Sequence, residues 1–357
     1  MAKIALVTDT HFGFKNDSRE FLDYFAKFYD GVFFPTLRER GVTQVAHLGD
    51  IVDRRKYIGY VTLRRFHEMF LDRMRELDVW YLVGNHDVPY RNTNEVNALS
   101  ELLRAREDHG RIVSEPMTVD FDGCEVMLMP WINSGNYASC MSAMRDTRAQ
   151  VLFGHLEIKG FEMYRGQPSH EGFDRSVFDK FDVVCSGHFH RKSTDRNINY
   201  LGAPYELTWA DYEDVKGFHI FDTATRELEF VRNPYSIYKK VWYDDDGKSM
   251  DEATRVDASA VSGSHVKIIT VCKSNPYWFE KFVDAVNSAG PLSAQIVEDH
   301  KNMDSDFDDE DVERAEDTMS VIDGYVRGLE VSASVKTELD SLMRKLYNEA
   351  SNMESVE

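Results

Sequence analysis

The sequence predicts an α/β protein: a core of two sheets flanked by helices, then a small α+β module and a helical tail. Apolar runs of strand length alternate with amphipathic stretches over roughly the first hundred residues, and a strand-rich region follows. The pattern changes again after Asn233-Pro234. With 357 residues the chain is too long for one hydrophobic core, so several domains are expected.

The first part of the chain alternates between strands and helices. Lys3–Val7 is the first predicted strand, and apolar residues at helical spacing predict a helix at 18–40 that Gly41 ends. Strands that alternate with helices in this way pair in parallel through right-handed crossovers. The elements predicted next are a strand at 45–48, a helix at 60–76, a strand at 79–83 and a helix at 94–106.

The middle of the chain is rich in strands. Asp122-Gly123 is a strong turn signal between the apolar runs Met117–Phe121 and Cys124–Met129, and it predicts a hairpin. Two sheets packed face to face, with the helices outside, would accommodate these strands and the parallel ones. Further short strands are predicted at 151–153, 183–185, 199–201, 218–221 and 228–231.

The last third of the chain predicts two more parts. A strand at 266–271, a helix at 278–288 and a strand at 295–297 indicate a small α+β module. An acidic run at 304–311 is typical of a linker, and two amphipathic helices are predicted at 312–327 and 334–350. We therefore expect three domains, which cover residues 1–235, 236–300 and 301–357.

The composition is that of a soluble protein, with 42% hydrophobic and 29% charged residues. No apolar run approaches the ~20 residues of a membrane span. The four cysteines form no Cys-x-x-Cys pair, and Lys3–Val7 has the pattern of a strand rather than of a signal peptide. These features predict a cytoplasmic location, with no membrane contact and no disulfides.

The net charge is strongly negative. It is −20, and residues 299–357 alone contain 17 acidic and six basic side chains. A protein that binds a polyanion unaided usually presents a basic face, so this charge argues against strong nucleic-acid affinity of the chain by itself. A nucleic-acid substrate remains compatible with it, because bound cations would offset several negative charges at a site.

Five short motifs, each after an apolar run, carry the chemistry. In Gly49-Asp50-Ile51-Val52-Asp53 the glycine allows a sharp turn at the strand end, which places Asp50 on the rim of a sheet. Any one motif is more often a simple turn, but five in this order leave that interpretation little room. The other four motifs are Asp9-Thr10-His11, Gly84-Asn85-His86-Asp87, Gly154-His155 and Gly187-His188-Phe189-His190.

The donor atoms of these motifs predict a site for two cations. Carboxylates, imidazoles and one carboxamide suit Mn²⁺ and related first-row ions, and the lack of thiolates argues against structural zinc. Asp50 has two oxygens and can bridge two ions, and Asn85 offers a neutral oxygen. Two ions about 3.5–4 Å apart would clamp a phosphoryl group and activate a water molecule.

His86 is predicted to act differently from the other histidines. Because it is adjacent to Asn85, it should point away from the cations and toward a substrate, where it could protonate or stabilise the leaving oxygen. Asp53 is the natural partner to orient its imidazole, and Asp87 is the competing candidate.

In their order and spacing, the five motifs resemble those of the calcineurin-like metallophosphoesterases. The segment Tyr200-Leu201-Gly202-Ala203-Pro204-Tyr205, followed by Lys216-Gly217-Phe218, resembles more specifically the SbcD-type nucleases of double-strand-break repair within that superfamily. The resemblance covers about the first 235 residues. It implies a two-sheet metallophosphoesterase core, a DNA-capping domain at 236–300 and partner-binding helices at 301–357.

The resemblance also implies the roles of the site residues. It implies two Mn²⁺ ions, with Mg²⁺ as the alternative metal, and a catalytic His86. Some relatives carry a second histidine where this sequence has Asp53, and we assign Asp53 as the residue that orients His86. One ion would be held by Asp9, His11, Asp50 and His190, and the other by Asp50, Asn85, His155 and His188.

By the same resemblance the chain would be a DNA endo- and exonuclease for recombination, repair and replication. Double-stranded ends, hairpins and single strands would be its substrates, and an SbcC-type ABC ATPase would bind its C-terminal helices. It would form a homodimer through the helices at 60–76 and 94–106, although the apolar stripes of these helices could equally be core. The C-terminal helices could likewise pack on their own domain.

Two other functions stay open. Asp50-x-x-Asp53-Arg54 also resembles the phosphatase version of the motif, so a phosphatase or phosphodiesterase acting on phosphoproteins or small molecules is the alternative. The third possibility is a scaffold with reduced catalytic activity that regulates its ATPase.

Four basic residues next to the motifs are candidate contacts for DNA phosphates, although solvated surface is the other interpretation for each. They are Arg54, Arg55, Lys56 and Lys192.

Overall fold

The computed structural model describes residues 2–103, 110–164 and 166–297, together with positions 335, 339, 342 and 343. Apart from those four positions, the linker predicted at 304–311 and the helices predicted at 312–327 and 334–350 lie outside the described residues. Within the described part of the chain, no helix combines the length and the apolar character needed to cross a bilayer.

The first sheet contains the strands of the alternating part of the chain. The three strands predicted to pair in parallel do so, as β1, β2 and β3, and β4 adds a fourth parallel strand that was not predicted. Two antiparallel strands extend the sheet beyond β1 in the order β14-β13-β1-β2-β3-β4. Its strands are β1 (Lys3–Val7), β2 (Gln44–His47), β3 (Asp78–Leu82), β4 (Arg111–Val113), β13 (Gly217–Asp222) and β14 (Leu228–Arg232).

The second sheet is also mixed, in the order β11-β12-β10-β7-β6-β5. The predicted hairpin around Asp122-Gly123 joins β5 to β6, and the central strands β6, β7, β10 and β12 pair in parallel. Its strands are β5 (Met117–Phe121), β6 (Cys124–Met129), β7 (Val151–His155), β10 (Val183–Gly187), β11 (Ser193–Asp195) and β12 (Ile198–Tyr200).

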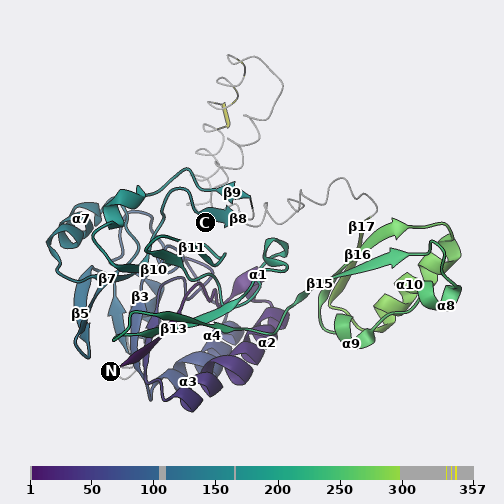
Figure 1. Ribbon diagram of the computed structural model, residues 1–357, viewed down its shortest axis with the longest axis horizontal. Helices are drawn as coiled ribbons and strands as arrows, with labels where there is room; N and C mark the ends of the chain where they lie inside the picture. The colour runs from purple at the N-terminus through teal and green to yellow at the C-terminus, as the bar shows by residue number, and fades with distance from the viewer. Residues whose placement is uncertain are drawn as a thin grey trace. The chain divides into compact units, whose positions relative to one another are not determined.

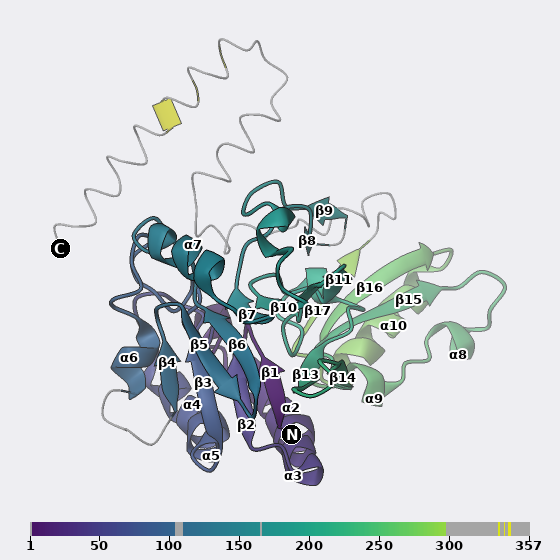
Figure 2. The same cartoon turned by 60° about the vertical axis from the view of Figure 1, so that its left-hand side comes forward.

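The two sheets pack face to face. Leu6, Ala46 and Leu82 from the first sheet and Val126 and Phe153 from the second are buried in one apolar cluster between them. A second cluster joins the outer face of the first sheet to its helices, and a third joins the second sheet to α7 (Tyr137–Asp146). Figures 1 and 2 show this arrangement, with helices outside both sheets, which confirms the predicted fold class.

The helix predicted at 18–40 is present, but a wider turn interrupts it. The π-helical turn lies just before Pro35, which has no N–H to complete a regular α-helical ladder. The helix predicted at 60–76 has a similar interruption. The segments are α2 (Arg19–Phe28), η1 (Tyr29–Phe33) and α3 (Phe34–Arg40), then α4 (Tyr60–Phe66), η2 (His67–Leu71) and α5 (Asp72–Met74).

The helix predicted at 94–106 begins later than expected, and α6 is described over Ala98–Leu103. The side chain of Asn97 accepts a hydrogen bond from Ser100 N at 2.8 Å, which is typical of an N-cap. The side chain of Asn94 donates instead to the main-chain oxygens of Ser114 and Trp131. The segment before Asn97 is therefore held as a loop by side-chain contacts that periodicity does not reveal.

Several short elements were not predicted. One is α1 (Phe14–Asp17), in which Lys15, Asn16 and Asp17 all have positive φ values, between 47° and 61°. These three residues follow the Asp9-Thr10-His11 motif after a gap of three residues. Other elements that were not predicted include β4, α7 and β11, together with β8 (Glu162–Tyr164), β9 (Gln167–Pro168), η3 (Arg175–Phe178) and η4 (Trp209–Asp211).

The α+β module has a parallel three-stranded sheet and a core of its own. Tyr243, Val266, Phe279 and Phe282 form this separate buried cluster. The predicted strands and helix are present, and β15 is an additional strand whose Lys239-Lys240 pair hid its pattern (Figure 1). The elements are β15 (Tyr238–Asp244), α8 (Met250–Ala253), α9 (Ala258–Val261), β16 (His265–Cys272), α10 (Pro276–Ser288) and β17 (Ser293–Val297).

Candidate metal centre

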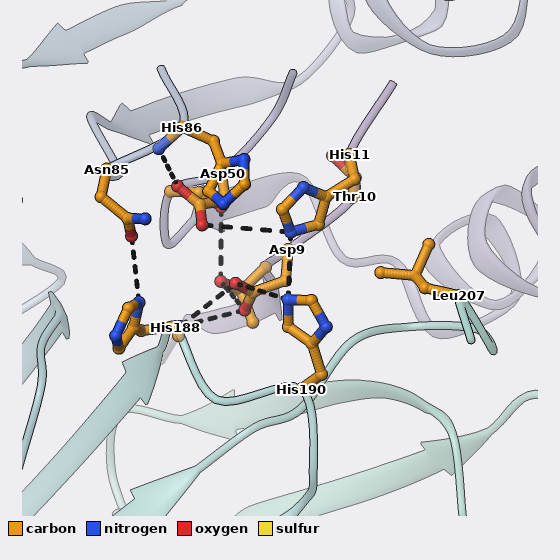
Figure 3. Close-up of polar contacts among 12 residues, drawn as sticks. Asp9, Thr10, His11, Asp50, Asn85, His86, His188, His190 and Leu207 are labelled. Atoms are coloured by element: carbon orange, nitrogen blue, oxygen red, sulfur yellow. Dashed lines mark hydrogen bonds and ion pairs between the residues drawn. The ribbon is translucent and has the colours of Figure 1, made fainter. Parts of the chain in front are cut away.

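The five motifs converge at one edge of the two sheets. Three of them follow β1, β2 and β3, and the other two end β7 and β10. Because these strands are parallel within their sheets, their carboxyl ends meet at the same edge. Figure 3 shows the side chains of both sheets pointing toward a common centre.

The first group of donors combines Asp9 and His11 with His190. Their ligand atoms lie within 4.8 Å of one another. The two imidazole Nε2 atoms are 3.1 Å apart, and His190 Nε2 is 3.9 Å from Asp9 Oδ1. Two imidazole nitrogens and a carboxylate oxygen around one point form a donor set that suits a divalent first-row cation.

The second group combines Asp50, His155 and His188, again within 4.8 Å. Asn85 belongs to it, because its Oδ1 is 2.8 Å from His155 Nε2 and 3.0 Å from His188 Nδ1. His155 Nδ1 lies 2.7 Å from the main-chain oxygen of Leu48. When Nδ1 donates to that oxygen, the Nε2 lone pair of His155 faces the site.

Asp50 stands between the two groups. Its Oδ2 is 3.3 Å from His155 Nε2 and 3.9 Å from His11 Nε2, so one oxygen faces an imidazole of each group. Its Oδ1 accepts a hydrogen bond of 2.8 Å from the main-chain N–H of His86. Asp50 is 1% exposed, and its position is the one that a bridging carboxylate requires.

The turn that carries Asp50 is held from behind by Asp87. The buried carboxylate of Asp87 accepts hydrogen bonds from the main-chain N–H groups of Gly84, Asp50, Ile51 and Val52, at 2.9 to 3.2 Å. Asp87, the competing candidate to orient His86, therefore supports the two loops that carry Asp50 and Asn85.

A glycine is required where these loops meet. A Cβ on Gly84 would lie 2.2 Å from Asp50 Oδ1, far closer than atoms can approach. Gly49 has a φ of 96°, a region that L side chains rarely adopt. The Gly-Asp and Gly-Asn pairs of the sequence thus reflect close backbone packing at the site.

Burial and charge together set the protonation of the site. Burial alone would lower the pKa of His11 and of His155, but Asp53 and Asp50 next to His11, and Asp50 next to His155, outweigh it and raise both pKa values to about 9. Burial would raise the pKa of Asp50, yet the charge on His155 holds it well below its usual range. Burial lowers the pKa of His188 to about 3, so this imidazole is neutral at physiological pH.

His86 and Asp53 are in contact, but not in the expected way. His86 Nδ1 lies 2.7 Å from the main-chain oxygen of Asp53, whereas the Asp53 carboxylate is 3.3 Å from His11 Nδ1. The imidazole of His86 is partly exposed and meets that of His11 edge to face, with ring centroids 4.6 Å apart. The main-chain oxygen of Asp53 thus contacts the His86 imidazole, whereas the Asp53 carboxylate contacts His11, a candidate metal ligand.

The candidate phosphate contacts do not form one cluster around the site. Arg54 pairs with Asp17 at 2.5 Å and stacks on Tyr57, 4.7 Å from the ring centroid. Lys192 is exposed and lies 5.3 Å from the ring centroid of Phe230. Lys56 is also exposed, and Arg55 is half-buried.

Sequence reasoning missed two supports of the centre. The Leu48 carbonyl that holds His155 is a main-chain group, so no residue type could have indicated it. The supporting role of Asp87 could have been suspected from its place directly after Asn85-His86, but its four hydrogen bonds are visible only in the fold.

The fold and this site define a class of protein: a metallophosphoesterase, in which two sheets hold paired groups of Asp, Asn and His side chains at one edge. Residues 2–192 match the family model of the calcineurin-like phosphoesterases, and the chain belongs to that family. It is accordingly a metal-dependent phosphodiester hydrolase.

One curated relative can be named. The chain is 31% identical over 320 residues to Exonuclease subunit 1 of Enterobacteria phage T4, an alignment that covers 88% of this chain and 89% of the relative. Among solved structures, an archaeal phosphodiesterase matches at a TM-score of 0.34 and 16% identity, covering 65% of this chain and 99% of its own.

Proposed function

We propose that this chain is the nuclease subunit of a complex that processes DNA ends for recombination, repair and replication. The similarity to a phage exonuclease subunit over most of both chains supports a DNA substrate and a partner subunit. The donor set supports Mn²⁺ over Mg²⁺, because four imidazoles contribute nitrogen ligands, whereas Mg²⁺ prefers oxygen.

The observation that carries the proposal is the place of Asp50 Oδ2, which faces an imidazole of each donor group. Asp9, His11 and His190 would hold one ion and Asn85, His155 and His188 the other, with Asp50 shared between them. When bound, the two cations supply a clamp for the phosphoryl group and activation of water.

His86 is suited to assist the leaving oxygen. Its Nδ1 lies 2.7 Å from the Asp53 carbonyl, so Nε2 is the ring nitrogen that we assign to the substrate. A protonated imidazole there can donate to the oxygen that leaves the phosphorus. The main-chain carbonyl of Asp53 keeps the His86 imidazole in place, and the Asp53 carboxylate lies next to His11 Nδ1.

Cleavage of end-labelled duplex DNA with Mn²⁺ tests the proposal. We expect Asp50→Asn to abolish cleavage and His86→Ser to lower kcat by about 10²–10⁴-fold, the usual contribution of general acid catalysis. The matched controls are Asp179→Asn and His170→Ser, two exposed residues outside the centre, which should cleave at the wild-type rate. Equal cleavage by Asp50→Asn and the wild type would refute the two-cation site.

The second candidate function is a phosphatase, which the Arg54 next to Asp53 favours. Arg54 is engaged with Asp17, however, and would have to leave this ion pair to grip a phosphate. A phosphomonoester and bis(p-nitrophenyl) phosphate run beside the DNA substrate separate the two functions. Turnover of the monoester without DNA cleavage would favour the phosphatase.

We also propose that residues 236–300 cap the DNA and that residues 301–357 bind an SbcC-type ABC ATPase. Separate core residues in the α+β module support a distinct role for it. A chain ending at residue 300 should lose the ATPase in a pull-down while keeping metal-dependent hydrolysis of bis(p-nitrophenyl) phosphate. Retention of the ATPase by the shortened chain would contradict this assignment.

A homodimer contact through α4 and the loop before α6 completes the proposal. Tyr60 is 90% exposed, and Val61 and Val96 are also exposed. Exposed apolar surface of this kind supports an interface where it forms one patch. Sedimentation of the full chain should give a dimer, and Val61→Asp should shift it toward the monomer.

A further inference from the structure

A buried ion pair lies next to the metal centre and belongs to none of the five motifs. Lys216, directly before β13, is 3% exposed, and Asp211, at the end of η4, is 5% exposed. Lys216 Nζ is 2.6 Å from Asp211 Oδ1. The other carboxylate oxygen of Asp211 accepts hydrogen bonds of 2.9 Å from the N–H groups of Leu207 and Thr208.

Lys216 also reaches a candidate metal ligand. Its Nζ donates a hydrogen bond of 2.8 Å to the main-chain oxygen of His190. The N–H of Ala203 donates to the same oxygen at 3.0 Å. A Cβ on Gly202 would lie 2.9 Å from this oxygen, so the segment before Ala203 closes tightly over it. Two donors and close packing therefore fix the peptide that follows His190.

The other end of the same motif is fixed by the centre itself. The N–H of His188 donates to both carboxylate oxygens of Asp9, at 3.1 and 3.2 Å, and His188 has a φ of 89°. The His188-Phe189-His190 segment is thus held at its start by Asp9 and at its end by Lys216. Figure 3 shows the His190 imidazole turned toward His11 and Asp9.

Stability alone does not account for a charged pair in this place. The cost of removing two charges from water is of the same size as their attraction, and well-packed apolar residues often do as well or better. An apolar side chain could not, however, donate to the His190 carbonyl. The hydrogen bond from Lys216 to the His190 carbonyl therefore explains why a polar side chain is buried here.

We propose that Lys216, oriented by Asp211, is a positioning residue that fixes the peptide after His190 and thereby directs the His190 imidazole to the cation site shared with Asp9 and His11. The inference rests on the proposed two-cation site and concerns only the ion that His190 would hold. The second ion, near Asn85, His155 and His188, should not depend on Lys216.

Mn²⁺ binding to the metal-stripped full chain tests this without measuring activity. The test variant is the double substitution Lys216→Met with Asp211→Asn, which removes both charges together and leaves an amide oxygen for the Leu207 and Thr208 N–H groups. By calorimetric titration we expect two binding events in the wild type. In the double variant one should weaken by about 10–100-fold, the usual effect of losing an outer-shell partner, and the other should keep its affinity.

Electron paramagnetic resonance gives a second readout. With two equivalents of Mn²⁺ the wild type should show a spin-coupled pair, and the double variant should show isolated Mn²⁺. Lys216→Gln, which keeps a neutral donor toward His190, should recover part of the coupled signal. Should the double substitution fail to fold, Lys216→Gln carries the test: it should weaken the same ion, by less than the double variant would, and unchanged binding of both ions by Lys216→Gln would then overturn the inference.

Lys180 provides the matched control. It too binds main-chain carbonyls, those of Met144, Arg145 and Thr147, but at the end of α7 and outside the metal centre. Lys180→Met should bind both ions like the wild type. Unchanged binding of both ions by the double variant would overturn the inference. A wild type that binds a single ion would refute the two-cation site itself, and the inference with it.

Discussion

At the scale of single residues, the structure indicates which histidines of the site carry a proton. His11 and His155 have pKa values raised to about 9, so in the metal-free protein both carry a proton at neutral pH. A metal ligand must be the neutral imidazole, so at the proposed two-cation site cations and protons would compete for these two side chains. His188, with its pKa lowered to about 3, is already neutral.

This competition predicts opposite pH dependences for the free and the metal-bound protein. A pKa raised from about 6.5 to about 9 stabilises the metal-free fold fully below pH 6.5, and this stabilisation is lost as the pH rises toward 9. The Tm of the stripped protein should therefore fall over this range. The apparent Mn²⁺ affinity should rise, by up to about tenfold per pH unit for each displaced proton.

Calorimetry in buffers of different ionisation enthalpy measures the proton release directly. At pH 7.5 Mn²⁺ binding should release protons, and at a lower pH it should weaken. A Mn²⁺ affinity that is constant between pH 6.5 and pH 8 would show that His11 and His155 are not protonated in the free protein.

At the scale of elements, the link between the two sheets and the α+β module depends on one buried carboxylate. Glu206 is 4% exposed and accepts hydrogen bonds from the Ser236 hydroxyl and from the N–H groups of Ile237 and Tyr238. Tyr238 OH donates in turn to the Leu207 carbonyl. The chain thus enters β15 already anchored to the loop that precedes η4.

Glu206→Ala should loosen this link. The substitution leaves several donors around residues 236–238 without their acceptor, which we expect to lower the free energy of unfolding by about 2–4 kcal/mol. Hydrogen exchange at the Ile237 and Tyr238 amides should speed up before global unfolding. The control is Glu229→Ala, which breaks an exposed ion pair with Arg40 and should cost less than about 1 kcal/mol. Unchanged hydrogen-exchange rates at both amides would show that Glu206 does not anchor this segment.

At the scale of the whole molecule, the net charge of −20 sets the affinity for DNA. Phosphate contacts by lysine and arginine supply most of the non-specific affinity of proteins for DNA. Here Arg54 is paired with Asp17, and the exposed lysines near the motifs are few. The isolated chain should accordingly bind DNA weakly, and the partner subunit that we propose should supply the remaining affinity.

Fluorescence anisotropy of a labelled duplex with the His86→Ser variant and Mn²⁺ checks this. We expect a Kd above about 1 µM near physiological salt, the range of non-specific binding, with a marked loss of affinity as salt rises. Lys56→Gln and Lys192→Gln should each flatten the salt dependence if these side chains contact phosphates. Nanomolar binding that resists salt would contradict the argument from charge.

The sequence by itself determined the fold class, the strands that carry the motifs and the set of side chains that meet at the centre. The reason is local: apolar runs of strand length followed by Gly, Asp and His indicate both a strand and its polar end. Parallel strands then require those ends to share one edge of each sheet. The π-helical turn before Pro35, the late start of α6 and the strand β15 were missed, because Pro35 and Asn97 act through backbone contacts and Lys239-Lys240 obscures the periodicity.

Only the tertiary structure decided how the centre is held. Asp53 contacts His86 through a carbonyl, Asp87 holds the Asp50 turn, and Lys216 reaches the backbone of His190 from another part of the chain. Each of these contacts involves a main-chain group, which every residue possesses and no sequence pattern distinguishes. The side chains that meet at the centre are therefore visible in the sequence, whereas the hydrogen bonds that orient them depend on the folded backbone.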